Sequence, residues 1–133
     1  MSLLSASKVT IDVREAADLQ LFHRMECRAC PLDQLRGDAG GKLEPTGADA
    51  PLVYVLGEGA GREELEEREQ FVGRSGQILR AHIPRAYRSK VRFNNTARCR
   101  PPKNATPTMR ILECCRPSVQ RDIERTKPKA IFG

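Results

Sequence analysis

The chain has 133 residues, 30% of them charged, with a formal net charge of +6. That length allows one domain at most, and the longest apolar run, Leu52–Leu56, is far too short to cross a bilayer. The N-terminus lacks a basic-then-apolar signal pattern, so we expect a cytoplasmic protein with no membrane partner. The positive charge suits a polyanion partner, but many ordinary soluble proteins are equally basic. Five cysteines in a reducing compartment indicate metal binding or reactivity rather than disulfides.

Residues 1–11 are expected to form a weakly ordered lead-in, and residues 12–133 the folded domain. Asp12 and Glu15 resemble a capping box and predict a helix that Pro31 ends. Residues 33–50 are rich in Gly, Asp and Ala, a composition that predicts a surface loop.

The central stretch predicts a buried strand over Leu52–Leu56, a tight glycine turn over residues 57–61, an acidic segment, and a second glycine turn around Phe71. Open α/β sheets bind ligands at the carboxyl ends of such strands. The first turn lacks the Lys-Ser/Thr of a phosphate loop, and Arg62 stands where a dinucleotide fingerprint has its third glycine. Taken alone, the turn fits a plain strand-to-helix connection equally well.

The second half of the chain alternates predicted helices and strands. In order, these are a helix over Gln77–Ile83, a strand over Val91–Ala97, a Pro-rich loop over Arg98–Pro107, a helix over Thr108–Arg125 kinked at Pro117, and a strand over Lys129–Gly133. The alternation predicts an α/β fold with a parallel sheet flanked by helices. Because the last strand would leave an open edge, we expect a further segment or a partner chain to complete the sheet.

Cys27 and Cys30 form a C-x-x-C knuckle at a helix end. A zinc ribbon needs a second close pair, whereas the remaining thiols are Cys99, Cys114 and Cys115. One knuckle with two separated positions suits a [4Fe–4S] cluster better. A zinc-binding structural domain, a redox-active C-x-x-C and a set of simply buried thiols remain alternatives.

Six blocks occur in a fixed order, and together they cover about residues 22–133. They are Cys27-x-x-Cys30-Pro-Leu, Gly57-Glu58-x-x-Gly61-x-x-Glu64, Phe71-Val72-Gly73-Arg74-x-Gly76-x-x-Leu79, Asn95-x-x-Arg98-Cys99-Arg100-Pro101-Pro102-x-Asn104-x-x-Pro107, Cys115-Arg116-Pro117 and Lys127-Pro128-Lys129-Ala130-Ile131. The combination resembles the family 4 uracil-DNA glycosylases, the iron–sulfur members of the uracil glycosylase superfamily.

The resemblance implies a three-layer α/β/α glycosylase fold and a DNA repair enzyme. Its substrate would be DNA containing uracil, and it would flip the uracil out and hydrolyse the N-glycosidic bond. The resemblance also places the ligands of a [4Fe–4S] cluster on Cys27, Cys30, Cys99 and Cys115, and it leaves Cys114 outside the ligand set.

The same resemblance implies a base pocket. Phe71 would stack on the flipped uracil, Asn95 would read its polar edge, Gly57 and Gly59 would line the pocket, and Glu58 would be the catalytic carboxylate. An amide supplies the donor and acceptor needed for that edge, and a carboxylate can stabilise an oxocarbenium-like transition state. The plainer alternatives are a core phenylalanine at Phe71 and a turn-capping amide at Asn95.

Arg98, Arg100 and Lys103 lie in the Pro-rich loop, where we expect them to contact DNA phosphates. Of the acidic run, only Glu64 matches a family position; the rest fits a solvated face.

The chain departs from the family in three places. Ala60 and Gln70 replace prolines that usually stiffen the two turns. The family also continues with a late His-Pro motif, and neither His23 nor His82 has that context. We therefore expect a fold that is incomplete at its C-terminus. The alternatives are a noncatalytic iron–sulfur module that binds DNA or protein, and the glycosylase-like portion of a larger repair or replication enzyme.

Overall fold

The computed structural model describes residues 27–33 and 42–133. A four-stranded sheet has the order β1-β3-β2-β4. The strands are β1 (Thr46–Gly47), β2 (Val53–Gly59), β3 (Val91–Ala97) and β4 (Ala130–Phe132). Strand β2 pairs in parallel with β3 and β4, while β1 is antiparallel to β3. The fold is therefore of the predicted α/β class, with one antiparallel edge strand.

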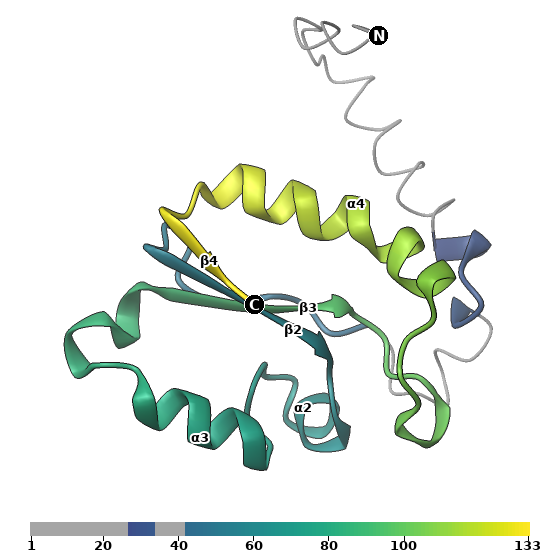
Figure 1. Cartoon of the computed structure of the whole chain (residues 1–133), viewed down its shortest axis with the longest axis horizontal. Helices are drawn as coiled ribbons and strands as arrows, with labels where there is room; N and C mark the ends of the chain where they lie inside the picture. Colours follow the sequence, from purple (N-terminus) through teal and green to yellow (C-terminus); the bar gives the residue numbers. More distant parts are fainter. Residues whose placement is uncertain (1–26, 34–41) are drawn as a thin grey trace, which may run out of the picture.

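Helices lie on both sides of this sheet, as Figure 1 shows. Helix α4 (Met109–Thr126) covers one face, and α2 (Arg62–Glu67) and α3 (Arg74–His82) lie on the other. Two 3-10 helices, η3 (Arg85–Lys90) and η4 (Pro102–Asn104), precede and follow β3.

The predicted strand over Val91–Ala97 matches β3 residue for residue, and the predicted helix over Thr108–Arg125 matches α4 within one residue at each end. Thr108 is the N-cap of α4, and its Oγ1 accepts a hydrogen bond from the Ile111 N–H at 3.3 Å. The helix continues through Pro117. Of the helix predicted from Asp12, most lies outside the described residues, but residues 27–29 are helical.

Three boundaries differ from the sequence predictions. Gly57 and Gly59 belong to β2 instead of a tight turn, because both pair with β3. Part of the predicted 33–50 loop forms β1, where Gly47 has φ +103° and a Cβ would strike the Val91 carbonyl. Helix α3 starts at Arg74, three residues before the predicted start.

Side chains on the two faces of β3 pack into two different kinds of core, one apolar and one ionic. One face contributes Val91 and Phe93 to an apolar cluster with Val55. On the opposite face, Arg92 donates from Nε to Asp122 Oδ2 on α4 at 2.7 Å. Tyr54 also donates to Asp122 Oδ2, at 2.7 Å. A buried ionic network thus fixes α4 on the sheet.

Candidate functional site

Gly57 and Asn95 face each other at the carboxyl ends of the two adjacent parallel strands β2 and β3. A Cβ built on Gly57 would lie 2.7 Å from Phe71 Cζ and would collide with Asn95 Oδ1. Position 57 is therefore glycine because two predicted pocket residues occupy its side-chain space. The structure brings Gly57, Phe71 and Asn95 together at the sheet edge where α/β folds bind ligands.

Several contacts fix the conformation of the loop that carries Phe71. Phe71 has a left-handed backbone conformation with φ +56°, and a Cβ on Gly76 would overlap its carbonyl group. Arg80 Nε donates to the Phe71 carbonyl at 2.9 Å. The Phe71 ring packs at 5.5 Å, centroid to centroid, on Phe93. A strained conformation fixed by several contacts is common at ligand sites.

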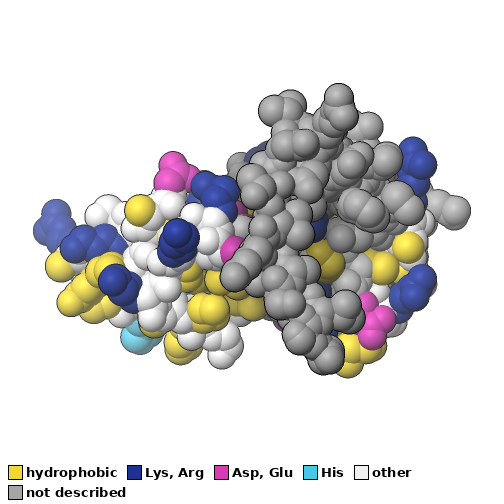
Figure 2. All heavy atoms as spheres, turned by 90° about the horizontal axis from the view of Figure 1, so that it is seen from above, with side chains coloured by type: hydrophobic (Ala, Val, Ile, Leu, Met, Phe, Trp, Pro, Cys, Tyr) yellow, Lys and Arg dark blue, Asp and Glu magenta, His cyan; other side chains and the backbone are white. Residues whose placement is uncertain are grey.

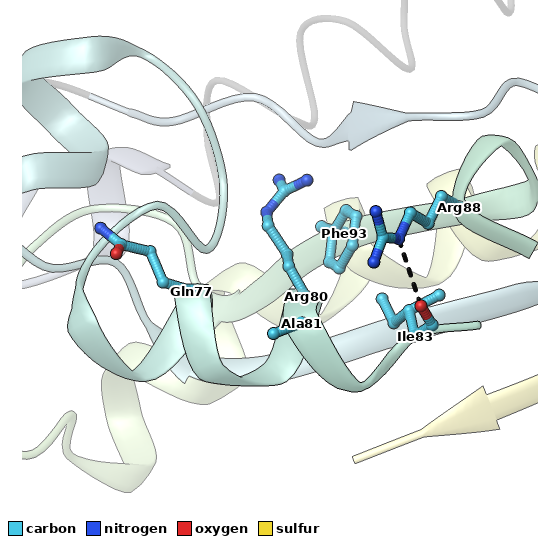
Figure 3. Close-up of a pocket in the computed structure, with 6 residues that line it drawn as sticks. All are labelled: Gln77, Arg80, Ala81, Ile83, Arg88 and Phe93. Carbon is cyan, nitrogen blue, oxygen red and sulfur yellow. Dashed lines mark hydrogen bonds between the residues drawn. The ribbon is translucent and has the colours of Figure 1, made fainter. Parts of the chain in front are cut away.

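Arg80 also lies over Phe93, with its Cζ 4.2 Å from the ring centroid. Both residues line a neighbouring pocket of about 390 Å³ between α3 and β3 (Figure 3). In that view Arg88 extends from the other side and donates from Nε to the Ile83 carbonyl at 3.2 Å. Arg80 thus ties helix α3 to the Phe93 ring and to the backbone of Phe71.

Gln70, which precedes Phe71, is fully buried. Its Oε1 accepts from Asn95 Nδ2 at 2.5 Å, and its Nε2 donates to the Glu44 carbonyl at 3.1 Å. Its backbone oxygen accepts from Arg80 Nη2 at 2.5 Å. The absence of proline at this position was expected to loosen the turn, but these hydrogen bonds hold it in place.

Glu58 and Gly59 complete the set predicted on β2. The Glu58 side chain is exposed at the carboxyl end of the strand, and its backbone oxygen accepts from Thr96 Oγ1 at 2.8 Å. A Cβ on Gly59 would make ordinary contacts of 3.8 Å or more. Glu58 is open to a ligand, and no close contact requires glycine at position 59.

All five cysteines line a cavity of about 20 Å³ between residues 27–33, the end of β3 and α4. The lining consists of Cys27, Cys30, Leu32, Asp33, Lys42, Cys99, Cys114, Cys115 and Ser118. Among the described residues, no group of three or more His, Cys, Asp or Glu side chains has the arrangement that would hold a metal ion.

The thiols in this cavity are shifted toward their protonated forms. Burial raises the pKa of Cys99 to about 11, with a smaller contribution from Cys115. Burial also raises the pKa of Cys115 and of Cys30, and the Cys114 thiol adds to the latter. Because metals bind thiolates, loading this site would release protons. The donor set fits a thiolate-ligated cofactor such as an iron–sulfur cluster.

The three predicted phosphate-binding residues do not behave alike. Arg98 is 5% exposed and donates to the Leu43 carbonyl at 3.2 Å and to Glu44 Oε2 at 2.5 Å. It is therefore unavailable to DNA, which corrects the prediction for this residue. Arg100 donates to Asn104 Oδ1 at 2.7 Å beside η4, and Lys103 is exposed.

Two features of the site were not foreseen from the sequence. One is the hydrogen bond between the Gln70 and Asn95 side chains. The only sign of it in the sequence was a glutamine at position 70, where the family usually has proline. The other is the pair of hydrogen bonds from Arg80 to the backbone oxygens of Gln70 and Phe71. In addition, Arg92 is buried against Asp122.

The chain belongs to the uracil-DNA glycosylase superfamily, because the family model for that superfamily matches residues 44–133. Three curated relatives are named type-4 uracil-DNA glycosylase. The protein of Pyrobaculum aerophilum is 35% identical over 87% of this chain and 60% of its own length. Those of Thermotoga maritima and Archaeoglobus fulgidus are 34% and 30% identical, over 81% and 80% of this chain and 56% and 53% of their own lengths.

The chain thus spans a little over half the length of the curated relatives it matches. Within residues 27–33 and 42–133, no helix has the length and apolar character needed to cross a membrane.

Proposed function

We propose that this chain carries the uracil pocket and the iron–sulfur site of a uracil-DNA glycosylase that acts in base excision repair. The observation that carries the proposal is the convergence of Gly57, Phe71 and Asn95 at the carboxyl ends of β2 and β3. A flipped base needs one aromatic face and one amide that reads its polar edge. Phe71 and Asn95 supply these two groups side by side.

In the proposed reaction the bond between the deoxyribose C1′ and uracil N1 breaks. The water oxygen bonds to C1′ and keeps one proton as the new hydroxyl group, and the other proton ends on the released uracil. Glu58 is the carboxylate that would stabilise positive charge on the sugar or orient the water. Its exposed side chain, next to Gly57, is open to the substrate.

The proposed cofactor is a [4Fe–4S] cluster on Cys27, Cys30, Cys99 and Cys115. Four cysteine thiolates would hold such a cluster. Five thiols around one cavity fit that donor set. When bound, the cluster would join residues 27–33 to β3 and α4. The proposed location is the cytoplasm, where thiols stay reduced.

Two further elements belong to this proposal. Arg100 and Lys103 would contact DNA phosphates beside the pocket, through charge rather than sequence. A further segment or partner chain would complete the sheet along β4, where the large apolar side chains of Ile131 and Phe132 are exposed. Figure 2 shows hydrophobic side chains among Lys and Arg side chains on one face of the molecule.

The test of the function is abasic-site formation on an oligonucleotide that contains one uracil, with anaerobically purified protein. We expect cleavage by the wild type and its loss in Phe71→Ala and Asn95→Ala. No cleavage by protein with a full cluster complement would refute a catalytic role for this chain and would leave a binding module.

A further inference from the structure

Gln70 uses all four of its hydrogen-bonding groups inside the fold. Its backbone N–H donates to Thr46 Oγ1 at 3.4 Å, and its backbone oxygen accepts from Arg80 Nη2 at 2.5 Å. Its side-chain amide bridges the Glu44 carbonyl and Asn95. A side chain fixed at both ends and fully buried cannot rotate without losing hydrogen bonds.

The order of donors and acceptors from the Glu44 carbonyl through the Gln70 amide to Asn95 is fixed. The Glu44 carbonyl can only accept, so it requires the Nε2 of Gln70 as its donor. Gln70 Oε1 must then face Asn95, and an oxygen there requires the Nδ2 of Asn95 as its donor. Asn95 Oδ1 is consequently turned to the opposite side, toward the space that a Cβ on Gly57 would occupy beside Phe71.

This direction matters for base choice. Uracil offers an N3–H donor and an O4 acceptor, whereas cytosine offers an N3 acceptor and an N4 amino donor. An asparagine amide free to turn by 180° could pair with either edge. With Oδ1 fixed toward the pocket and one Nδ2 hydrogen left over, Asn95 matches the uracil pattern and mismatches the cytosine pattern.

We propose that Gln70 is a positioning residue that fixes the orientation of the Asn95 amide and thereby enforces the preference for uracil over cytosine. This inference rests on the proposed function, because it assigns Asn95 to the base edge. The Glu44 carbonyl, which lies outside the pocket, fixes the orientation of the Gln70 amide. The Gln70 amide in turn fixes the orientation of the Asn95 amide that faces the base.

The first test needs no substrate. In the isotope-labelled wild type, the two Nδ2 protons of Asn95 should give separate signals, with the one bonded to Gln70 protected from solvent exchange. In Gln70→Met, which keeps the side-chain length and removes both polar atoms, that proton should lose its protection and both Nδ2 signals should change their chemical shifts. Unchanged Asn95 signals in that variant would show that Gln70 does not hold the amide.

The second test compares single-turnover base release or, if release is absent, binding for two oligonucleotides that differ by uracil or cytosine at one position. We expect the uracil preference to fall by about tenfold or more in Gln70→Met, and to be retained in Gln70→Glu, whose carboxyl oxygen can still accept from Asn95. Gln120→Met, an exposed glutamine on α4, is the matched control and should keep the wild-type ratio.

The outcomes separate the two proposals. A wild type that prefers uracil and a Gln70→Met variant that keeps this preference would overturn the role of Gln70 and leave the proposed function intact. A cluster-loaded wild type with no preference between the two oligonucleotides would contradict the proposed function and, with it, the role of Gln70 in base choice. Far-UV circular dichroism checks that each variant is folded.

Discussion

The carboxylate of Asp122 anchors α4 on the sheet, and we expect Asp122→Asn to remove much of the domain's stability. Oδ2 accepts from Arg92 Nε and from the Tyr54 hydroxyl, each at 2.7 Å, and Oδ1 accepts from Arg92 Nη2 at 2.8 Å. The side chains of Arg92 and Asp122 are 8% and 11% exposed. Asparagine would remove the buried counter-charge of the guanidinium and leave only the exposed Asp49 carboxylate, 3.5 Å from Nη1.

Removing one partner of a buried ion pair costs about 3–5 kcal/mol. A natural domain has a free energy of unfolding of about 5–15 kcal/mol, so this substitution alone should remove a large share of it. Glu124→Gln neutralises an exposed carboxylate two residues further along the same helix. That control should change the free energy of unfolding by no more than about 0.5 kcal/mol.

The effect depends on pH in a definite direction. Burial alone would raise the pKa of Asp122, but the hydrogen bonds from Arg92 and Tyr54 outweigh it, and the pKa lies below its ordinary value. The stabilisation by the carboxylate is therefore complete above the unfolded-state pKa of about 4 and is lost as the pH falls through the lower folded-state value. The gap between wild type and Asp122→Asn should shrink only below about pH 4.

The assay is urea unfolding followed by far-UV circular dichroism, with all variants in the same cofactor state. The slope of the free energy against urea should stay constant while the midpoint falls. A loss equal to that of Glu124→Gln at neutral pH would refute the reasoning, because Asp122 would then not hold α4 on the sheet.

Three further results are expected. Gly57→Ala should fold normally but lose binding to uracil-containing DNA, because its Cβ needs the space of Asn95 Oδ1; retained binding would contradict this pocket. Elemental analysis should find no iron in Cys99→Ala, which should also be less soluble, and about four irons per chain in Cys114→Ala. An intact cluster in Cys99→Ala would refute the ligand assignment. Lys103→Ala should lower the salt dependence of DNA binding by about one unit of log–log slope without changing base preference; an altered preference would contradict a phosphate contact.

Regular elements were predictable where local signals agreed with the tertiary structure. The strand over Val91–Ala97 lies between a basic segment and a Pro-rich loop, and the apolar spacing from Leu112 to Ile123 marks α4. Strand β1 has two residues and no apolar pattern, so nothing local distinguished Thr46–Gly47 from a loop. Its position depends on pairing with β3, which is a long-range contact.

The residues of the candidate site likewise divide into those that a sequence pattern indicated and those that depend on long-range contacts. Phe71 and Asn95 were found through the family pattern, and both side chains occupy the space that a Cβ on Gly57 would need. Charge alone could not tell that Arg98 turns inward to the Leu43 carbonyl while Lys103 faces solvent. Burial of a charged side chain depends on partners far away in the sequence, which composition does not reveal.

The central claim is that Gly57, Phe71 and Asn95 form a uracil site. The most direct measurement is a titration of isotope-labelled, cluster-loaded protein with free uracil, followed by chemical-shift changes. We expect the largest changes on the Gly57 backbone amide, the Phe71 ring and the Asn95 side-chain amide, and we expect them to be absent in Gly57→Ala. Saturating changes elsewhere, with these three groups unmoved, would contradict it.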